Sequence, residues 1–303
     1  MVTVGDGVVL AIVGGRYRVY QDGTVIEASI RGRMKQEKGV KVLVGDRVVL
    51  HRHPDDSATI EEVKPRRSLL RRRAPGKSTG VRPVAANVDQ VIVVGAARQP
   101  DWDPHMIDRF IAVAEASELA AVVVMNKIDL ETAAASELDV YRDAGYAVLA
   151  TSVRARTGID ELRSLLADKT SLFTGSSGVG KSTLLNFLHP GLNLRTGAVS
   201  ARGGMGRHTT VGAEMHPLDG GFVVDTPGLR DIGLWGLSPA EVAAAFPELE
   251  RFRGECHFDN CRHLIEPGCA VVEAVTRKEL SAQRLSSYRR LLEEAGTAAR
   301  HWE

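Results

Sequence analysis

The sequence predicts a multidomain protein, in which a small N-terminal β-barrel precedes an α/β domain with a parallel sheet and a mainly helical C-terminal domain. Three observations predict it. Short apolar runs fill residues 1 to about 63, strands alternate with helices after Ala85, and helical spacing dominates after about Leu237. The predicted domains are 1–68, 69–235 (with a basic linker at its start) and 236–303, and 303 residues suffice for two or three domains.

The N-terminal region is predicted to be all β. The turn dipeptides Gly14-Gly15 and Asp22-Gly23 separate its first three runs. About five short strands without a convincing helix predict a closed barrel, either an OB-fold or an SH3-like barrel, and periodicity does not separate the two. The predicted strands are Val8–Val13, Arg16–Tyr20, Val25–Ala28, Val40–Leu50 and Thr59–Val63.

A basic stretch follows the barrel. Between Lys64 and Arg82 there are eight Lys or Arg residues and no Asp or Glu. Such a block is a candidate for contacting phosphates, and a solvated linker is the alternative. Its proline and glycine content favours the linker, which is the expectation here.

Strands and helices alternate from Val88 onward, which predicts a parallel sheet with both faces covered. Ligands of such sheets bind at the carboxyl ends of the strands, where both Asn126 and Gly175 lie. The predicted strands are Val88–Val94, Ala120–Met125, Tyr146–Ala150 and Leu172–Thr174. The predicted helices are Met106–Leu119, Ala133–Ala144, Ile159–Ala167 and Lys181–Leu188.

A phosphate-binding P-loop is predicted after the strand that ends at Thr174. Its glycines let backbone N–H groups face a phosphate. Lys181 is expected to reach the β- and γ-phosphates, and Ser182 to bind Mg²⁺. The alternative is a plain glycine-rich turn, but a strand before it and a helix after it favour the P-loop. The residues are Gly175, Ser176, Ser177, Gly178, Val179, Gly180, Lys181, Ser182 and Thr183.

A guanine-reading motif, Asn126-Lys127-Ile128-Asp129, is predicted at the end of another strand. The Asp129 carboxylate can accept two hydrogen bonds from guanine, whereas adenine offers no such donor pair. Lys127 can lie along the base and Asn126 can brace the loops. Thr151 and Ser152, after the next strand, can supply backbone contacts. The alternative is that Asp129 merely caps a helix.

The guanine motif precedes the P-loop, which reverses the order found in ordinary GTPases and indicates circular permutation. Asp225-Thr226-Pro227-Gly228 follows an apolar strand. Asp225 can hold Mg²⁺, and the Gly228 N–H can sense the γ-phosphate. The glycine-rich segment 201–210 is expected to supply a threonine to Mg²⁺; Thr210 is favoured over Thr209, and a plain flexible loop is the alternative.

The residue after Gly228 is Leu229, where many GTPases carry a glutamine that orients the attacking water. Leucine cannot do so, and hydrolysis is therefore expected to be slow or to use another group. His208 is the nearest candidate, with a structural or merely exposed histidine as the alternative.

Three cysteines, Cys256, Cys261 and Cys269, lie within fourteen residues. An odd, clustered set argues against a disulfide framework. With His263 they form a three-cysteine, one-histidine set typical of a closed structural zinc site, which would add folding energy; buried free cysteines are the alternative. The next predicted helix, Arg277–Glu294, carries Arg284, Arg289 and Arg290 on its polar side, and zinc modules beside basic helices often contact nucleic acid.

These features together resemble the family of ribosome small-subunit-dependent GTPases A (RsgA) over nearly the whole chain, including Ala85–Gln90 and Gly206–Thr210. The resemblance implies an OB-fold, a circularly permuted GTPase domain and a zinc domain. It implies GTP hydrolysis stimulated by the small ribosomal subunit, late in that subunit's maturation. It also favours His208 as a catalytic residue and Thr210 as the switch threonine, although Val211 stands where many members have a third threonine.

The expected function is therefore a GTPase that acts in maturation of the small ribosomal subunit and binds its rRNA. A GTP-controlled RNA-binding module with incidental hydrolysis and a metabolic P-loop kinase are the alternatives. The N-terminus lacks signal-peptide features and no apolar run approaches ~20 residues, so a cytoplasmic protein without a membrane partner is expected. Nothing demands a dimer, and a monomer is expected.

Overall fold

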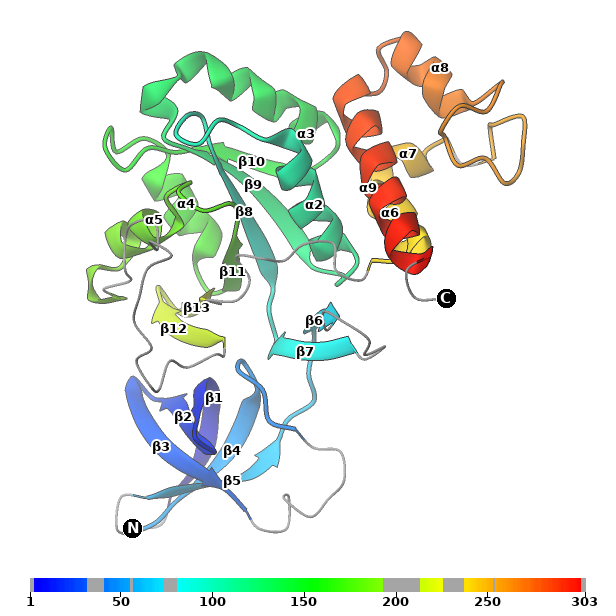
Figure 1. Cartoon of the computed structure of the whole chain (residues 1–303). Helices are drawn as coiled ribbons and strands as arrows, with labels where there is room; N and C mark the ends of the chain where they lie inside the picture. The colour runs from blue at the N-terminus through cyan, green and yellow to red at the C-terminus, as the bar shows by residue number, and fades with distance from the viewer. Residues whose placement is uncertain are drawn as a thin grey trace, which may run out of the picture.

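The computed structural model describes residues 3–31, 41–54, 57–73, 81–192, 213–225, 237–252 and 254–300. Figure 1 shows a barrel below a sheet domain, with the C-terminal helices beside that domain. The predicted succession of barrel, α/β domain and helical domain is confirmed. The domain boundaries after residues 68 and 235 stay predictions.

Five strands close the barrel in the order β1-β2-β3-β5-β4. Both hairpin turns, at Gly14-Gly15 and Asp22-Gly23, have positive φ at both positions, as type I′ hairpin turns require. β3 pairs with β5 in parallel and β1 closes on β4, which is the connectivity of an OB-fold. The strands are β1 (Thr3–Val13), β2 (Arg16–Gln21), β3 (Thr24–Ile30), β4 (Arg47–Arg52) and β5 (Ala58–Val63).

Two expectations near the barrel are corrected. The strand expected within Val40–Leu50 begins only at Arg47. The stretch expected to be a linker contains an antiparallel β-ribbon, made of β6 (Leu69–Arg73) and β7 (Val81–Ala86). Leu70 and Ala85 pair at its base, and both are buried in the core beneath the sheet. This hydrophobic anchor explains why the chain forms a ribbon there.

The central sheet has six strands in the order β10-β9-β8-β11-β13-β12. All neighbours are parallel except the edge strand β12, which pairs antiparallel with β13 and was not predicted. The strands are β8 (Gln90–Ala96), β9 (Ala120–Asn126), β10 (Ala147–Ala150), β11 (Thr170–Thr174), β12 (Glu214–Leu218) and β13 (Gly221–Asp225).

Helices cover both faces of this sheet, as predicted. Val91 and Val93 of β8 pack in the cluster with α2, while Ile92 and Val94 pack in the cluster with α4 and α5. The helices are α2 (Pro104–Glu115), α3 (Asp139–Asp143), α4 (Ile159–Leu166) and α5 (Lys181–Leu188). Short 3₁₀ turns are η1 (Ile128–Leu130), η2 (Thr132–Leu138) and η3 (Pro190–Leu192).

The helix predicted over Ala133–Ala144 is only partly present. Its first half is the 3₁₀ segment η2, and only Asp139–Asp143 is α-helical. The Ser136 hydroxyl donates to the Ala133 carbonyl at 3.0 Å, a local bond that competes with regular helix formation.

Polar contacts join the barrel to the sheet domain. The Asn87 side chain donates to the Gly45 carbonyl of the barrel at 2.8 Å, and its carbonyl oxygen accepts from the Arg67 N–H at 2.9 Å. Arg18 of β2 pairs with Glu214 of β12. A Cβ on Gly45 would lie 2.0 Å from the Ala86 carbonyl oxygen, so the two parts are packed closely here.

The C-terminal helices enclose their own core, which includes Val242, Phe246 and Leu291. They are α6 (Pro239–Ala244), α7 (Pro247–Glu250), α8 (Ala270–Thr276) and α9 (Ala282–Arg300). In the described part of the chain, no helix has the length and apolar character needed to cross a membrane.

The prediction that Arg284 lies on the polar side of the last helix is wrong. Its side chain is 0% exposed and pairs with Asp108 of α2 at 2.6 Å and with Glu248 of α7 at 2.5 Å. The guanidinium also lies 4.4 Å from the centre of the Phe246 ring. Carboxylates from two other helices permit this burial, and α9 is thereby joined to the sheet domain through α2.

Candidate functional site

The predicted P-loop connects β11 to α5 in the structure. Gly175, Gly178 and Gly180 all have positive φ, which residues with a Cβ rarely adopt. A Cβ on Gly175 would lie 2.0 Å from the Val94 carbonyl oxygen. The Lys181 ammonium donates to the carbonyls of Gly175 at 2.6 Å and Ser176 at 2.8 Å, and so lies within the loop. This is the geometry of a phosphate cradle.

The guanine motif lies beside the P-loop, as the parallel sheet predicts. The Asn126 amide donates to the Val179 carbonyl at 2.9 Å and accepts from the Thr151 hydroxyl at 3.2 Å. The Lys127 ammonium donates to the Gly178 carbonyl at 2.7 Å and to the Gln99 carbonyl. Two residues of the motif therefore brace the phosphate loop directly, by side-chain bonds.

The Asp129 carboxylate is exposed at this edge and has a fixed orientation. Ser152 donates its hydroxyl to Asp129 Oδ1 at 2.5 Å, and the Ala155 N–H donates to the Ser152 oxygen at 3.0 Å. Ile128 is 8% exposed and packs in the core, so only its backbone faces the site. A carboxylate held in this way can accept from two adjacent donors of a base.

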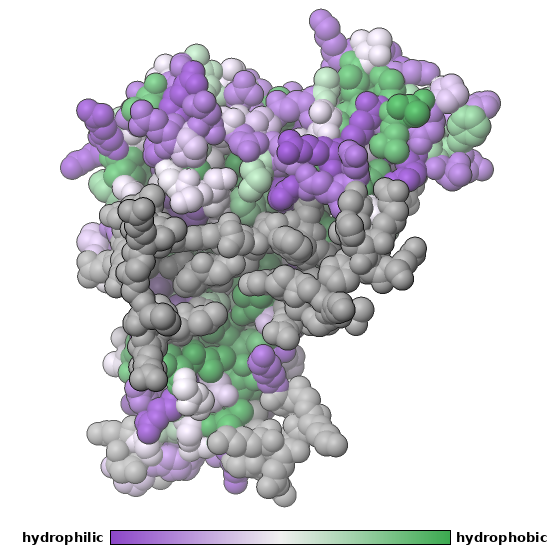
Figure 2. Space-filling view, viewed as in Figure 1, coloured by the Kyte–Doolittle hydropathy of each residue, from purple (hydrophilic) through white to green (hydrophobic). Residues whose placement is uncertain are grey.

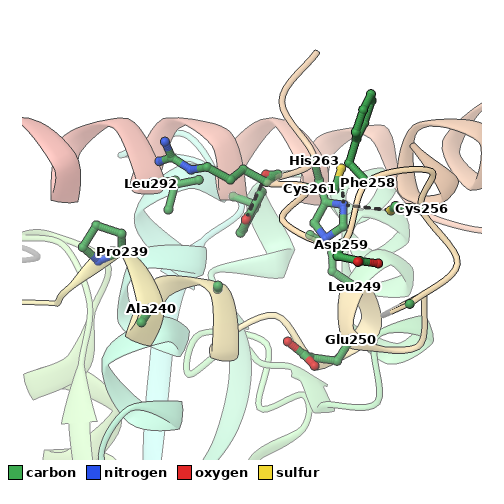
Figure 3. A pocket seen from close by; sticks show the side chains of 14 residues that line it. Pro239, Ala240, Leu249, Glu250, Cys256, Phe258, Asp259, Cys261, His263 and Leu292 are labelled. Carbon is green, nitrogen blue, oxygen red and sulfur yellow. Dashed lines mark hydrogen bonds between the residues drawn. The ribbon is translucent and has the colours of Figure 1, made fainter. Parts of the chain in front are cut away.

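The four predicted metal ligands meet in the C-terminal domain. Their ligand atoms, three Sγ and one His263 nitrogen, all lie within 4.8 Å of one another. Figure 3 shows Cys256 and Cys261 beside the His263 ring, on the loop between α7 and α8. His263 Nδ1 lies 3.6 Å from the sulfurs of Cys256 and Cys261, and 3.4 Å from that of Cys269.

These distances fit a metal better than hydrogen bonds. One imidazole nitrogen cannot make three hydrogen bonds to sulfur, whereas four donors around one ion place each S and N about 3.5 Å apart for tetrahedral zinc bond lengths. The Glu266 carboxylate accepts from the N–H groups of Arg262 and Leu264, which holds the loop in shape. The cluster can therefore hold a metal ion.

A model of the RsgA GTPase family matches residues 63–235, and a model of the RsgA N-terminal domain matches residues 6–60. A protein of Gemmatimonas aurantiaca named small ribosomal subunit biogenesis GTPase RsgA is 48% identical over 303 residues, covering 97% of this chain and 98% of that protein. The chain belongs to the RsgA family of GTPases.

Other relatives agree. A protein of Moorella thermoacetica, also named small ribosomal subunit biogenesis GTPase RsgA, is 44% identical and covers 95% of this chain and 97% of its own. The crystal structure of YjeQ from Thermotoga maritima matches with a TM-score of 0.79 and 32% identity, covering 97% of this chain and 99% of that one. YloQ, described as a circularly permuted GTPase, matches with a TM-score of 0.76 and 29% identity, over 97% and 96%. This member of the RsgA family is thus a GTPase with permuted motif order.

Several predicted site residues of this RsgA member are not accounted for by the structure. His208, Thr209, Thr210, Gly228 and Leu229 lie outside the described residues. Asp225 ends β13, the strand next to β11 in the sheet, so its backbone lies at the same edge as the P-loop. The roles of these residues stay predictions.

The sequence did not predict the contact between Lys127 and Gln99, and it predicted only part of the role of Thr151 and Ser152. Gln99 contributes a backbone carbonyl to Lys127, which no motif reveals because any residue supplies a carbonyl. Thr151 and Ser152 were expected to give backbone contacts to the base, but their side chains bond Asn126 and Asp129. The hydroxyl residue types were the only available signal for this role.

Proposed function

We propose that this chain hydrolyses GTP on the small ribosomal subunit, late in the maturation of that subunit. The observation that carries the proposal is the bracing of the guanine motif against the P-loop by Asn126 and Lys127. The proposed subunit is supported by relatives that match almost the whole chain and are named small ribosomal subunit biogenesis GTPases. The proposed partners are GTP or GDP and the subunit's rRNA, with the protein a monomer working in the cytoplasm.

In the nucleotide site, Asp129 reads guanine and the backbone of Gly175–Thr183 surrounds the phosphates. Lys181 neutralises charge on the β- and γ-phosphates. The residues proposed to hold Mg²⁺ are Ser182, Asp225 and Thr210, and the Gly228 N–H is proposed to detect the γ-phosphate. When bound, Mg²⁺ offsets the negative charge that develops on the phosphate oxygens.

His208 is proposed as the residue that activates or orients water, because Leu229 has no polar group for this task. Its segment and the Asp225–Gly228 loop are proposed to become ordered with GTP. Contact with the subunit then stimulates hydrolysis, and the GDP form leaves. The domains 1–68 and 236–303 are proposed to contact rRNA, mainly through phosphates.

The metal held by Cys256, Cys261, His263 and Cys269 is proposed to be zinc with a structural role, because four protein ligands leave no open position. We expect one zinc per chain by elemental analysis of protein purified without added metal. Cys261→Ser should lower that ratio and the Tm, since the loop loses a ligand. A Cys269→Ser variant with unchanged zinc and Tm would contradict the assignment.

GTP turnover measured with and without purified small ribosomal subunits tests the main proposal. We expect strong stimulation by small but not large subunits. His208→Ala should retain GTP binding and lose most of the stimulated rate, whereas Lys181→Ala should weaken nucleotide binding as well. Intact GTP binding without any stimulation by small subunits would overturn the ribosomal assignment and leave a permuted GTPase with another activator.

A further inference from the structure

The connection from β8 to α2, residues 97–103, lies at the same edge of the sheet as the P-loop and the guanine motif (Figure 1). We call it the β8–α2 loop. Its residues Arg98, Gln99 and Pro100 are exposed, and this edge of the sheet domain is mainly hydrophilic in Figure 2. Trp102 departs from that pattern, because its side chain is half-buried and packs against the core that contains α2. One large apolar side chain therefore anchors an otherwise exposed loop.

The indole of Trp102 occupies a position that requires a glycine beneath it. A Cβ built on Gly95 of β8 would lie 2.6 Å from Cε3 of the indole, closer than van der Waals contact allows. The indole also meets the Tyr141 ring edge to face, with ring centres 6.1 Å apart, which is a favourable aromatic geometry. The indole Nε1 is buried and has no hydrogen-bond partner among the described residues. Packing alone therefore positions this ring.

Three residues before Trp102, the β8–α2 loop reaches the nucleotide site. The Lys127 ammonium donates to the Gln99 carbonyl as well as to the Gly178 carbonyl, so it joins the guanine motif, this loop and the P-loop. A Cβ built on Gly178 would lie 3.6 Å from Cδ of Pro100, so the two loops also pack together. Gln99 has a φ of 55°, a left-handed conformation that costs energy for a residue with a Cβ and persists only where neighbours enforce it.

The Gln99 carbonyl matters because Lys127 has a long and flexible side chain. Fixing such a side chain costs conformational entropy, and a binding site that fixes it in advance gains affinity. Two carbonyl acceptors from two different loops hold the Lys127 ammonium, and this sets the direction of its aliphatic stem before a base arrives. Displacement of the β8–α2 loop would leave the ammonium with the Gly178 carbonyl alone of these two. The position of this loop therefore controls how well the base site is prepared.

We propose that Trp102 is a positioning residue for guanine-nucleotide binding, and that it acts on Lys127 through the Gln99 carbonyl. The indole, packed on Gly95, holds the β8–α2 loop where that carbonyl reaches the ammonium. The role requires no contact between the indole and the nucleotide. The proposal rests on the proposed function, because it takes the base site from the assignment made there.

Binding of GDP to the full-length protein with Mg²⁺, measured by calorimetry, tests this role. Trp102→Ala should weaken GDP binding by roughly 5- to 10-fold, the effect of one lost hydrogen bond. Trp102→Phe should keep the wild-type affinity, because a ring still fills the site and the indole Nε1 has no bond to lose. Phe222→Ala is the matched control, because it removes another half-buried ring from the same core at the amino ends of the strands. It should lower the Tm as Trp102→Ala does and leave GDP affinity unchanged.

Two double variants test the path. Gly95→Ala should weaken GDP binding as Trp102→Ala does, because the added methyl group displaces the indole, and the two changes together should be no worse than Trp102→Ala alone. Trp102→Ala should likewise add nothing in a Lys127→Ala protein, because the indole acts through that ammonium. An additive loss with Lys127→Ala would overturn the proposed path. If Trp102→Ala does not fold, Gly95→Ala carries the test, since it removes no side chain, and wild-type affinity in that variant would contradict the proposal.

A comparison of GDP with inosine diphosphate separates this role from base reading. Inosine lacks the exocyclic amine that Asp129 is proposed to bind, so Asp129→Asn should reduce the ratio of the two affinities, whereas Trp102→Ala should weaken both equally. A reduced ratio in Trp102→Ala would contradict a path through Lys127. A wild-type protein without affinity for GDP would show that the proposed function is wrong. Intact wild-type affinity that Trp102→Ala fully retains would leave the proposed function standing and overturn the role of Trp102.

Discussion

Two groups of arginines in this molecule have opposite surroundings. Arg284 of α9 is fully buried between the C-terminal helices and α2, with two carboxylates and the Phe246 ring around it. Arg71 of β6 is exposed and has no hydrogen-bond or ion-pair partner among the described residues. The first arginine joins two parts of one chain, and the second makes no such contact within those residues.

The comparison teaches that an arginine's role depends on where its counter-charges lie in space. Asp108, the partner of Arg284, is 176 residues away in the sequence. The stretch Lys64–Arg82, which contains Arg71, carries no Asp or Glu. Stability should therefore respond very differently to the loss of each arginine.

The largest effect is expected for Arg284→Ala, which leaves two buried carboxylates without their cation. The free energy of unfolding should fall by about 3–5 kcal/mol, measured by chemical denaturation. The triple change Arg284→Met/Asp108→Leu/Glu248→Leu should recover much of that loss, because it removes every buried charge together. A loss below about 1 kcal/mol for Arg284→Ala would contradict the view that this pair joins the two domains.

The smallest effect is expected for the matched change Arg71→Ala. Because no partner is lost, the free energy of unfolding should stay within ~0.5 kcal/mol of wild type. A large destabilisation would show that Arg71 is structural after all, and the contrast with Arg284 would fail.

The sequence was sufficient to predict that the guanine motif and the P-loop meet at one edge of the sheet, because strand ends can be read locally. Asn126 ends β9 and Gly175 follows β11, and parallel strands bring their carboxyl ends to one edge. The barrel was likewise predicted by its turn dipeptides, whose positive φ values the structure confirms. The convergence of Cys256, Cys261, His263 and Cys269 followed from spacing alone.

The failures concern positions whose environment is set by distant residues. Arg284 has a polar side chain at a helical position that sequence periodicity cannot distinguish from a solvent-facing one, since Asp108 and Glu248 come from other helices. The ribbon was missed because its composition resembles a linker, while its anchor at Leu70 and Ala85 depends on burial under the sheet. Gln99 acts through its backbone, which no side-chain pattern records.

The hydrogen bonds from Asn126 and Lys127 to the P-loop carbonyls run across the sheet edge, between segments about fifty residues apart. Because these bonds join the two loops through space, the order in which the chain visits them has no bearing on how they fit together. A domain of this kind can therefore be opened at one connection and joined at another during evolution while the contacts of its nucleotide site are kept. The reversed motif order of this chain changes how the strands are connected, and the contacts between the two loops of the site do not depend on that connection.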